Sequence, residues 1–326
     1  MKSVAMTSGL SALVLMSALA GTTVEARAET VTLNVVTAWS KESDWERGFW
    51  VFADKVEELS EGRVELKYVG GPEAVPPFQL IEAVRTGVVD LATNAGSYFS
   101  SVVREGDAMK LSELTPWEER ENGAYDKLRE ILAGHGVHYL GRYHTPGVEF
   151  NFYTRNEINS TADFQGVPLR ISPLYRSLAL ALGIVPVTMP HAEIYTALER
   201  GLVDGLGAGN IGIYEQGHHE FVRYIVEPGF YGNDQCIIMN LDQWESLPED
   251  VQDILTEAAK QTERETYESV TELASEERRK LLDAGLQAVT LSDADVYTEL
   301  AKEKGWEDVI AVAPVTGPEL MELLTK

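Results

Sequence analysis

The chain of 326 residues has a single cysteine, Cys236. One cysteine excludes an intramolecular disulfide, so the folded protein must be stable through packing alone. A reactive thiol is the alternative role for this residue. However, residues 235–239 have the composition of a buried strand, where cysteine usually behaves as a small apolar side chain. We therefore expect Cys236 to be structural.

Positive charge is also scarce. The sequence has 27 lysines and arginines against 52 aspartates and glutamates, a formal net charge of −25. A surface this acidic repels phosphate groups, which argues against nucleic acids and anionic lipid headgroups as partners. Beyond residue 28 no apolar run reaches the ~20 residues that a bilayer-spanning helix needs, so we expect no direct membrane insertion.

The first 28 residues have the layout of a cleaved secretory signal. Lys2 supplies the early positive charge, residues 9–21 are mostly apolar, and Ala26-Arg27-Ala28 fits a small-x-small cleavage site. A membrane anchor is the alternative, but the apolar run is too short to cross a bilayer. We predict a signal peptide over residues 1–28 that is cleaved after Ala28, leaving a mature chain with a net charge near −26.

Motifs of common enzyme classes are missing. The sequence has no phosphate-binding glycine loop, no dinucleotide fingerprint and no Gly-x-Ser-x-Gly elbow. One dense cluster of histidine and carboxylate is present, His218-His219-Glu220. Adjacent residues diverge by about 100° on a helix, so the cluster does not form the i, i+4 pair of zinc-binding helices. We expect neither a metal nor another cofactor, and an enzyme is the weaker functional class.

Strand and helix patterns alternate along the chain. Strands are expected at residues 30–37, 64–68 and 88–92, with helical spacing of apolar residues between them. This alternation predicts an α/β architecture with largely parallel sheets. About 298 residues after the signal are too many for one simple core and predict two lobes. A long helix is expected over residues 246–282 near the C-terminus.

A short internal repeat supports the two lobes. Residues 83–90 align with residues 197–204 at an offset of 114, with identical alanine, glycine, valine and aspartate positions. Each copy predicts a helix that ends at a glycine and is followed at once by a short strand, over residues 88–92 and 202–205. Ligands of open α/β sheets bind outside the carboxyl ends of the strands. Two lobes that each present such an end imply a ligand between them.

Arg170 is the centre of the stretch from residue 161 to residue 210. It lies between Leu169 and Ile171 in a short predicted strand, so alternation directs it away from the face that these two residues occupy. A polar helix start follows at residues 190–195 and a helix at residues 194–200. A strand-borne guanidinium beside a helix start suits the binding of an anion better than catalysis. Its planar fork can make two parallel bonds to a carboxylate, which lysine cannot copy.

These motifs, in this order, resemble the solute-binding proteins of tripartite ATP-independent periplasmic (TRAP) transporters. The resemblance rests on residues 52–64, 83–90, 162–170, 183–198, 201–205 and 244–248 and spans nearly all of the chain beyond residue 28. It implies a periplasmic receptor with two α/β lobes, crossing strands, a ligand cleft between the lobes and a long C-terminal helix. The receptor would close on a small organic anion and deliver it to the membrane subunits of a TRAP permease. We predict that residues 29–147 with 236–275 form one lobe, and residues 148–235 with 276–326 the other.

In the family that the chain resembles, the arginine corresponding to Arg170 binds the ligand carboxylate. Two departures concern specificity. Glu149 stands where many members have a second ligand-binding arginine, and Ala208 stands at a usual asparagine position, with Asn210 two residues later. His191 replaces a frequent aromatic residue. These changes argue against sialic acid or a simple dicarboxylate and favour a small monocarboxylate.

The residues predicted to bind the ligand are Arg170, Glu149, His191, Asn210, Trp39, Asn94, Tyr231 and Asn233. If Glu149 faces the cleft, the ligand carries a cationic or hydrogen-bond-donating group, because burying two carboxylates together is costly. The alternative is that the phase of its strand turns Glu149 outward. The functional alternative is an exported enzyme that uses His191 and Glu193 as acid and base.

Overall fold

Two β-sheets, each packed against helices, build the protein. The computed structural model describes Met1, residues 30–145 and residues 147–326, so the predicted signal peptide lies outside the described residues. The first sheet has the order β2-β1-β3-β10-β4 and the second β11-β9-β5-β8-β6-β7. The strands of the first sheet are β1 (Val31–Thr37), β2 (Val64–Gly70), β3 (Leu91–Ala95), β4 (Val137–Arg142) and β10 (Gln235–Asn240). Those of the second are β5 (Phe150–Thr154), β6 (Pro168–Ile171), β7 (Val185–Thr188), β8 (Gly205–Gly209), β9 (Tyr224–Glu227) and β11 (Gln287–Thr290).

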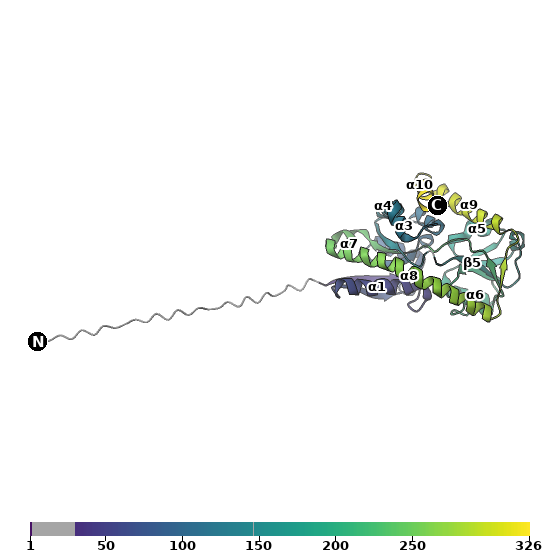
Figure 1. Ribbon diagram of the computed structural model, residues 1–326, viewed down its shortest axis with the longest axis horizontal. Helices are drawn as coiled ribbons and strands as arrows, with labels where there is room; N and C mark the ends of the chain where they lie inside the picture. Colours follow the sequence, from purple (N-terminus) through teal and green to yellow (C-terminus); the bar gives the residue numbers. More distant parts are fainter. Residues whose placement is uncertain (2–29, 146) are drawn as a thin grey trace.

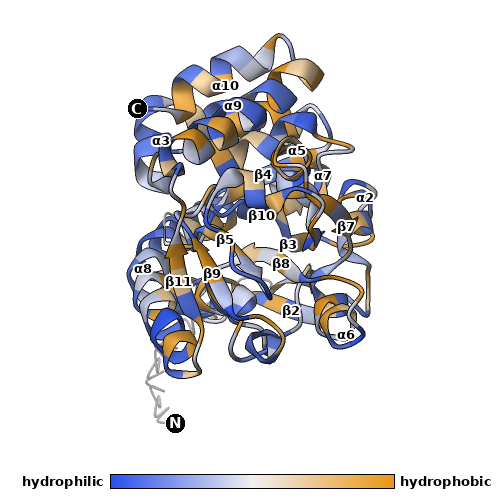
Figure 2. Ribbon diagram, turned by 90° about the vertical axis from the view of Figure 1, so that its right-hand side faces the viewer, coloured by the Kyte–Doolittle hydropathy of each residue, from blue (hydrophilic) through white to orange (hydrophobic). Residues whose placement is uncertain are grey.

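Ten α-helices lie among the described residues, and together with the sheets they confirm the predicted two-lobed α/β fold. Helices α9 and α10 lie at the opposite side of the molecule from α6 (Figure 2). The helices are α1 (Arg47–Ser60), α2 (Leu80–Arg85), α3 (Pro116–Asn122), α4 (Ala124–Ala133), α5 (Arg176–Ala181), α6 (Ile194–Glu199), α7 (Leu241–Ser246), α8 (Glu249–Asp283), α9 (Ala294–Val312) and α10 (Thr316–Leu324).

The sheets are mixed rather than largely parallel, which corrects the sequence-based expectation. Strand β1 runs parallel to β2 and β3, and β6 runs parallel to β7 and β8. In contrast, β10 is antiparallel to β3 and β4, and β5 is antiparallel to β8 and β9. Both exceptions are the strands at which the chain crosses from one sheet into the other, so each joins its sheet from the opposite lobe.

The internal repeat is confirmed as a repeat of structure. Helices α2 and α6 are offset by 114 residues at both ends, and so are strands β3 and β8. The predicted strand starts were wrong, because each strand begins three residues later than expected. In the first copy Gly87 has φ 71° and the amides of Val88 and Val89 both donate to the carbonyl oxygen of Ala83. These residues close the helix end, and only then does the strand begin.

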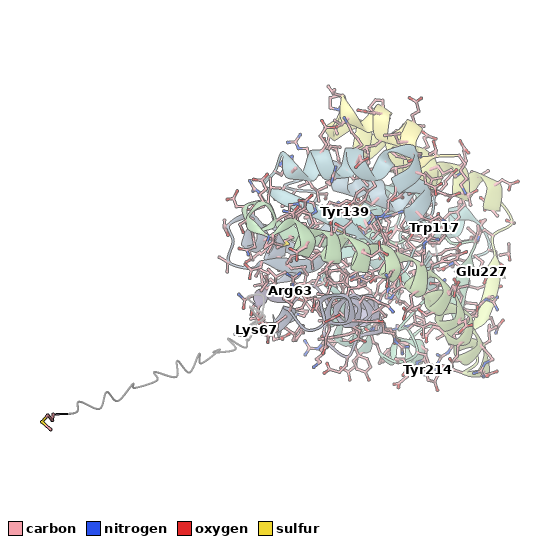
Figure 3. The ribbon with its side chains drawn as sticks, turned by 60° about the vertical axis from the view of Figure 1, so that its left-hand side comes forward. Arg63, Lys67, Trp117, Tyr139, Tyr214 and Glu227 are labelled. Atoms are coloured by element: carbon pink, nitrogen blue, oxygen red, sulfur yellow. The ribbon has the colours of Figure 1, made fainter. Side chains whose placement is uncertain are left out.

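Helix α8 is 35 residues long and connects the two lobes (Figure 1). Its first half packs on α1 and β4 of the first lobe. Near its C-terminal end, Glu277 accepts a hydrogen bond from the Tyr214 amide and Lys280 pairs with Glu215 at 2.7 Å, and both partners lie in the second lobe. Figure 3 shows this end of α8 beside the labelled Tyr214 and Glu227. The predicted start at residue 246 was wrong, because Ser246 ends α7.

The C-terminal helices contact both lobes. Helix α9 packs on α5 and on the short helix at Arg104–Leu111, and α10 packs on α3 and α4 as well as on that short helix. The predicted residue boundaries of the lobes stay a prediction.

Cys236 is fully buried in β10, where burial raises the pKa of its thiol, as expected for a structural residue. In the part of the chain that the structure describes, no helix has the length and apolarity needed to span a bilayer.

A buried ion pair ties α3 to α8. The guanidinium of Arg120 makes two bonds to the carboxylate of Glu263, at 2.6 and 2.9 Å, and also donates to the carbonyl oxygen of Leu140. The Glu263 side chain is only 2% exposed. Removing one partner of such a pair leaves the other buried without compensation, which is far more costly than losing an exposed pair.

We predict that Glu263→Ala lowers the free energy of unfolding by about 3–5 kcal/mol, measured by urea denaturation. The control is Glu265→Ala on the same helix. Glu265 is half exposed and pairs with Lys55 at 3.2 Å, so its loss should cost about 1 kcal/mol or less. Equal losses in the two variants would contradict the assignment of Glu263 as a buried anchor of α8.

Candidate functional site

A small cavity of about 30 Å³ lies between the two lobes. The first lobe contributes Trp39, Trp45, Ala95, Ser97 and Tyr98. The second lobe contributes Arg170, Ser172, Leu174, His191, Ala208 and Gly209. The crossing segments add Phe150, Asn233 and Asp234. The cavity therefore lies where the repeat predicts it, near the carboxyl ends of β3, β6 and β8.

Arg170 projects from β6 into this cavity, and its side chain is held by main-chain oxygens. Its neighbours Leu169 and Ile171 are both fully buried in the core, which confirms the predicted alternation. Nε and Nη2 donate to the carbonyl oxygen of Met189 at 3.2 and 2.8 Å, and Nη1 donates to that of Gly207 at 3.1 Å. These bonds fix the guanidinium plane, and Nη2 keeps a second hydrogen for a ligand.

Tyr175 completes the support of Arg170. Its hydroxyl donates to the same Gly207 carbonyl oxygen and lies 3.4 Å from Arg170 Nη1. A Cβ at Gly207 would lie 2.5 Å from the Tyr175 ring, so only glycine leaves room for this ring. The absence of a side chain in β8 thus allows an aromatic residue to pack beneath the arginine.

The Arg170 charge is buried without a protein counter-ion. Its exposed fraction is 2%, and no carboxylate among the described residues pairs with it within 4 Å. Burying an unpaired charge is costly, and buried charges in proteins are normally paired. An anion that entered the cavity would meet this unpaired charge.

Aromatic rings form the walls of the cavity. Trp39 stacks on Trp45 at 6.1 Å and on Tyr98 at 5.6 Å between ring centroids, and Trp45 packs against Phe150. The loop that carries both tryptophans is fixed by Glu46, whose carboxylate accepts hydrogen bonds from the Trp39 amide and the Thr93 hydroxyl. Burial raises the pKa of Glu46 well above its ordinary value. The walls are thus apolar and rigidly placed.

His191 is a further polar residue that the second lobe contributes, beside Arg170 and Ser172. Its ring lies 6.1 Å from that of Trp45 and 5.9 Å from that of His218. Burial, the charge of Arg170 and the neighbouring His218 lower the pKa of His191 well below its ordinary value. The ring is therefore neutral at neutral pH and can both donate and accept a hydrogen bond.

A groove of about 500 Å³ leads to the cavity and shares Trp39, Tyr98 and His191 with it. Pro77 and His191 both line this groove, and they begin equivalent turns in the two copies of the repeat. Glu193 is exposed and lies in the groove, outside the cavity. His191 lines this groove as well, and no hydrogen bond joins the two side chains among the described residues.

Four of the eight predicted ligand-binding residues line the cavity, namely Arg170, His191, Trp39 and Asn233. Asn94 and Tyr231 do not. Asn94 is buried below the cavity floor, where its amide donates to the Pro77 carbonyl oxygen. The Tyr231 hydroxyl donates to the Ala301 carbonyl oxygen at 2.8 Å, toward α9. Both side chains have protein partners that the sequence pattern could not show.

Glu149 and Asn210 lie outside the cavity, which corrects the expectation that they face the ligand. Glu149 is exposed, and both residues line a groove on the far side of the crossing segments. Adjacent strand residues point to opposite faces, and it is Phe150 that points into the cavity. Ala208 lines the cavity from β8, whereas Asn210 lies just beyond the end of that strand at Gly209.

Sequence reasoning missed Trp45, Tyr98 and Asp234 as cavity residues. Tyr98 follows directly after β3, in the small polar stretch that the repeat marks, so that signal could have identified it. Asp234 is adjacent to Asn233, which was predicted. Trp45 had no such signal, because its helical spacing with Phe49 and Phe52 is also that of a core residue.

The family model for the bacterial extracellular solute-binding proteins of family 7, DctP, matches residues 35–302. The chain belongs to the DctP family. As a TRAP-type solute-binding protein it is similar to the monocarboxylate 2-oxoacid-binding periplasmic protein of Nostoc sp., with 25% identity over 82% of this chain and 76% of that protein.

Solved structures confirm the fold of this DctP-family chain. A TRAP solute-binding protein from a marine metagenome, in complex with pyroglutamate, superimposes with a TM-score of 0.78 at 21% identity and covers 91% of this chain and 99% of that one. A pyroglutamic acid-binding receptor from Bordetella pertussis has a TM-score of 0.80 at 17% identity and covers 90% of this chain and 99% of that one.

The described residues include no group of three histidine, cysteine, aspartate or glutamate side chains placed to hold a metal ion.

The lowered pKa of His218 predicts a loss of stability in acid. Burial, the charge of Arg170 and the neighbouring His219 lower its pKa to about 4, whereas an unfolded histidine titrates near 6.5. Between these values the unfolded state binds the extra proton, so stability falls as the pH falls.

We predict that the free energy of unfolding of wild type falls by about 2 kcal/mol more between pH 7 and pH 5 than that of His218→Gln. Urea denaturation at both pH values measures this difference. Parallel curves for both proteins would contradict the buried, neutral state of His218.

Proposed function

We propose that this DctP-family protein is a periplasmic receptor that binds a small monocarboxylate in the interlobe cavity and delivers it to a TRAP permease. It reaches the periplasm through the signal peptide that is cleaved after Ala28, and it releases its ligand chemically unchanged. The observation that carries the proposal is Arg170, a buried guanidinium with fixed orientation and no carboxylate partner within the described residues.

The geometry favours a carboxylate as the anion. Three N–H groups donate to carbonyl oxygens, Nη2 keeps one hydrogen, and the further bond of Nη1 to the Tyr175 hydroxyl is long, at 3.4 Å. A carboxylate that displaces this long bond accepts from Nη1 and Nη2 in parallel, and such charge-assisted pairs are shorter and stronger than neutral hydrogen bonds. The three relatives described above bind a 2-oxo monocarboxylate or pyroglutamate, which agrees with one carboxylate per ligand.

The cavity also argues against a dicarboxylate. Among the residues that line it, Arg170 is the one permanently cationic side chain. His191 is kept neutral by its surroundings, and Ala208 offers no polar atom at the position of the family's asparagine. A second carboxylate would therefore be buried without a counter-charge.

Our first functional prediction concerns Arg170→Lys. Lysine cannot form the paired bonds, so the affinity for pyroglutamate or a short 2-oxo acid should fall tenfold or more, equivalent to roughly 1.5–3 kcal/mol. Isothermal titration calorimetry measures this loss directly. The control is Arg155→Lys, because Arg155 is exposed and pairs with Asp204 at 3.6 Å in the same lobe.

An unchanged affinity in Arg170→Lys would show that this residue is not the anchor.

Thermal shift measurements separate the receptor from the enzyme alternative. A receptor shows saturable stabilisation by the acid, because a ligand that binds only the folded state raises the melting temperature. Consumption of the acid during the measurement would instead support the enzyme.

Ligand entry requires the lobes to separate, because Arg170 is almost completely buried in the closed structure. The rotation would occur where the chain crosses between the sheets. There Glu149 and Gly232 form an isolated β-bridge, and the Phe150 amide donates to the Tyr231 carbonyl oxygen at 2.9 Å. Such paired crossing segments can act as a hinge between two rigid sheets.

We predict that saturating ligand lowers the radius of gyration measured by small-angle scattering. The ligand binds the closed form better, so it shifts the population toward closure. Arg170→Lys, titrated at the same ligand concentration, serves as the control and should keep the larger radius. Identical scattering curves of wild type with and without ligand would contradict the hinge.

A further inference from the structure

Asp234 is a second buried charge in the cavity. Asp234 is only 2% exposed and directly precedes β10. Oδ2 accepts a hydrogen bond from the Ser97 amide at 2.7 Å. Burial raises the pKa of Asp234, and the hydrogen bonds from Ser97 oppose that rise. One oxygen of this carboxylate is therefore held by the first lobe.

Nearby cations are occupied elsewhere. Lys110 donates to Asp107 at 2.7 Å and to the Leu174 carbonyl oxygen, and its ammonium lies over the Tyr231 ring. No lysine or arginine among the described residues forms an ion pair with Asp234, and this includes Arg170. Two opposite buried charges thus line one cavity without neutralising each other.

Tyr98 lines the same cavity as Arg170 and Asp234. Burial raises the pKa of its hydroxyl to about 12, Arg170 lowers it and Asp234 raises it. No ion pair joins Arg170 to Asp234 in the described residues, although both line the cavity with Tyr98. A ligand that reaches from Arg170 past Tyr98 to Asp234 would meet a cation at one end and a hydrogen-bond acceptor at the other.

We propose that the ligand carries an N–H group that donates to Asp234 while its carboxylate is bound by Arg170. This inference rests on the proposed function of the cavity and narrows its ligand class to small amino, imino or lactam acids. The acid that recognises the second group of the ligand is thus Asp234 of the crossing segment, in place of the outward-facing Glu149.

The Asp234 carboxylate and the aromatic rings of the cavity both favour a nitrogen atom in the ligand. An ammonium or imino nitrogen would balance the Asp234 charge, whereas a plain carboxylic acid would leave two carboxylates facing each other in a buried site. The stacked rings of Trp39, Trp45 and Tyr98 present electron-rich faces, which attract cationic nitrogen. An ether or lactone oxygen in the same place offers neither charge nor a donor to Asp234.

The test uses pairs of acids in which one ring atom is nitrogen in the first member and oxygen in the second. L-Proline is compared with tetrahydrofuran-2-carboxylate, and L-pyroglutamate with its lactone counterpart, 5-oxotetrahydrofuran-2-carboxylate, by calorimetry on the mature wild-type protein. We expect the nitrogen member of at least one pair to bind roughly 10–100-fold more tightly, the range of a hydrogen bond to a charged group.

Asp234→Asn then locates the effect. An asparagine can still accept the Ser97 amide bond, so the fold should be kept, and urea denaturation of the variant without ligand checks this. The preference for nitrogen should fall to about threefold or less, or reverse, because the asparagine amide can donate to the ring oxygen. The matched control is Asp242→Asn, since Asp242 is exposed on α7 and lies outside the cavity lining.

The outcomes separate this inference from the proposed function. Equal affinities within both pairs in wild type would overturn the N–H subsite while carboxylate binding stands. Binding of plain acids but of neither nitrogen member would overturn it as well. A preference that survives in Asp234→Asn would remove Asp234 as its cause. If no carboxylate binds to wild type, the proposed function fails together with the inference.

Discussion

The buried guanidinium of Arg170 is the constraint on which the site depends. Its plane is fixed by the carbonyl oxygens of Met189 and Gly207, and it has no carboxylate partner among the described residues. A charge in this position destabilises the closed form without an anion and stabilises it with one. In the proposed function, this group would therefore select the ligand and link binding to closure of the lobes.

The duplicated architecture brings the remaining groups to that arginine. Helix α2 with β3 and helix α6 with β8 are equivalent units, so both sheets direct their carboxyl ends to one cavity. The crossing strands β5 and β10 join the lobes, and helix α8 spans both through its contacts with α1, β4 and residues 214–215. This arrangement permits rotation while each lobe stays rigid.

Much of this could be predicted from the sequence, because local patterns carried it. Periodicity and glycine stops located helices such as α1, α2 and α6, and strand alternation placed Arg170 opposite Leu169 and Ile171. The strands after Gly87 and Gly201 were predicted too early because two apolar residues in each helix end resemble a strand. Glu149 and Asn210 were predicted to face the ligand because the phase of a short strand cannot be set without its partners.

The sequence by itself determined the fold class, the two lobes and the position of the arginine that we propose as the anion anchor, since each depends on patterns within a few residues. The tertiary structure decided which polar groups remain without partners. Asn94 and Tyr231 are bonded to distant carbonyl oxygens, whereas Arg170 and Asp234, 64 positions apart, line one cavity and stay unpaired. Whether a buried group has a partner depends on chain segments far apart in sequence, and only the folded chain brings these together.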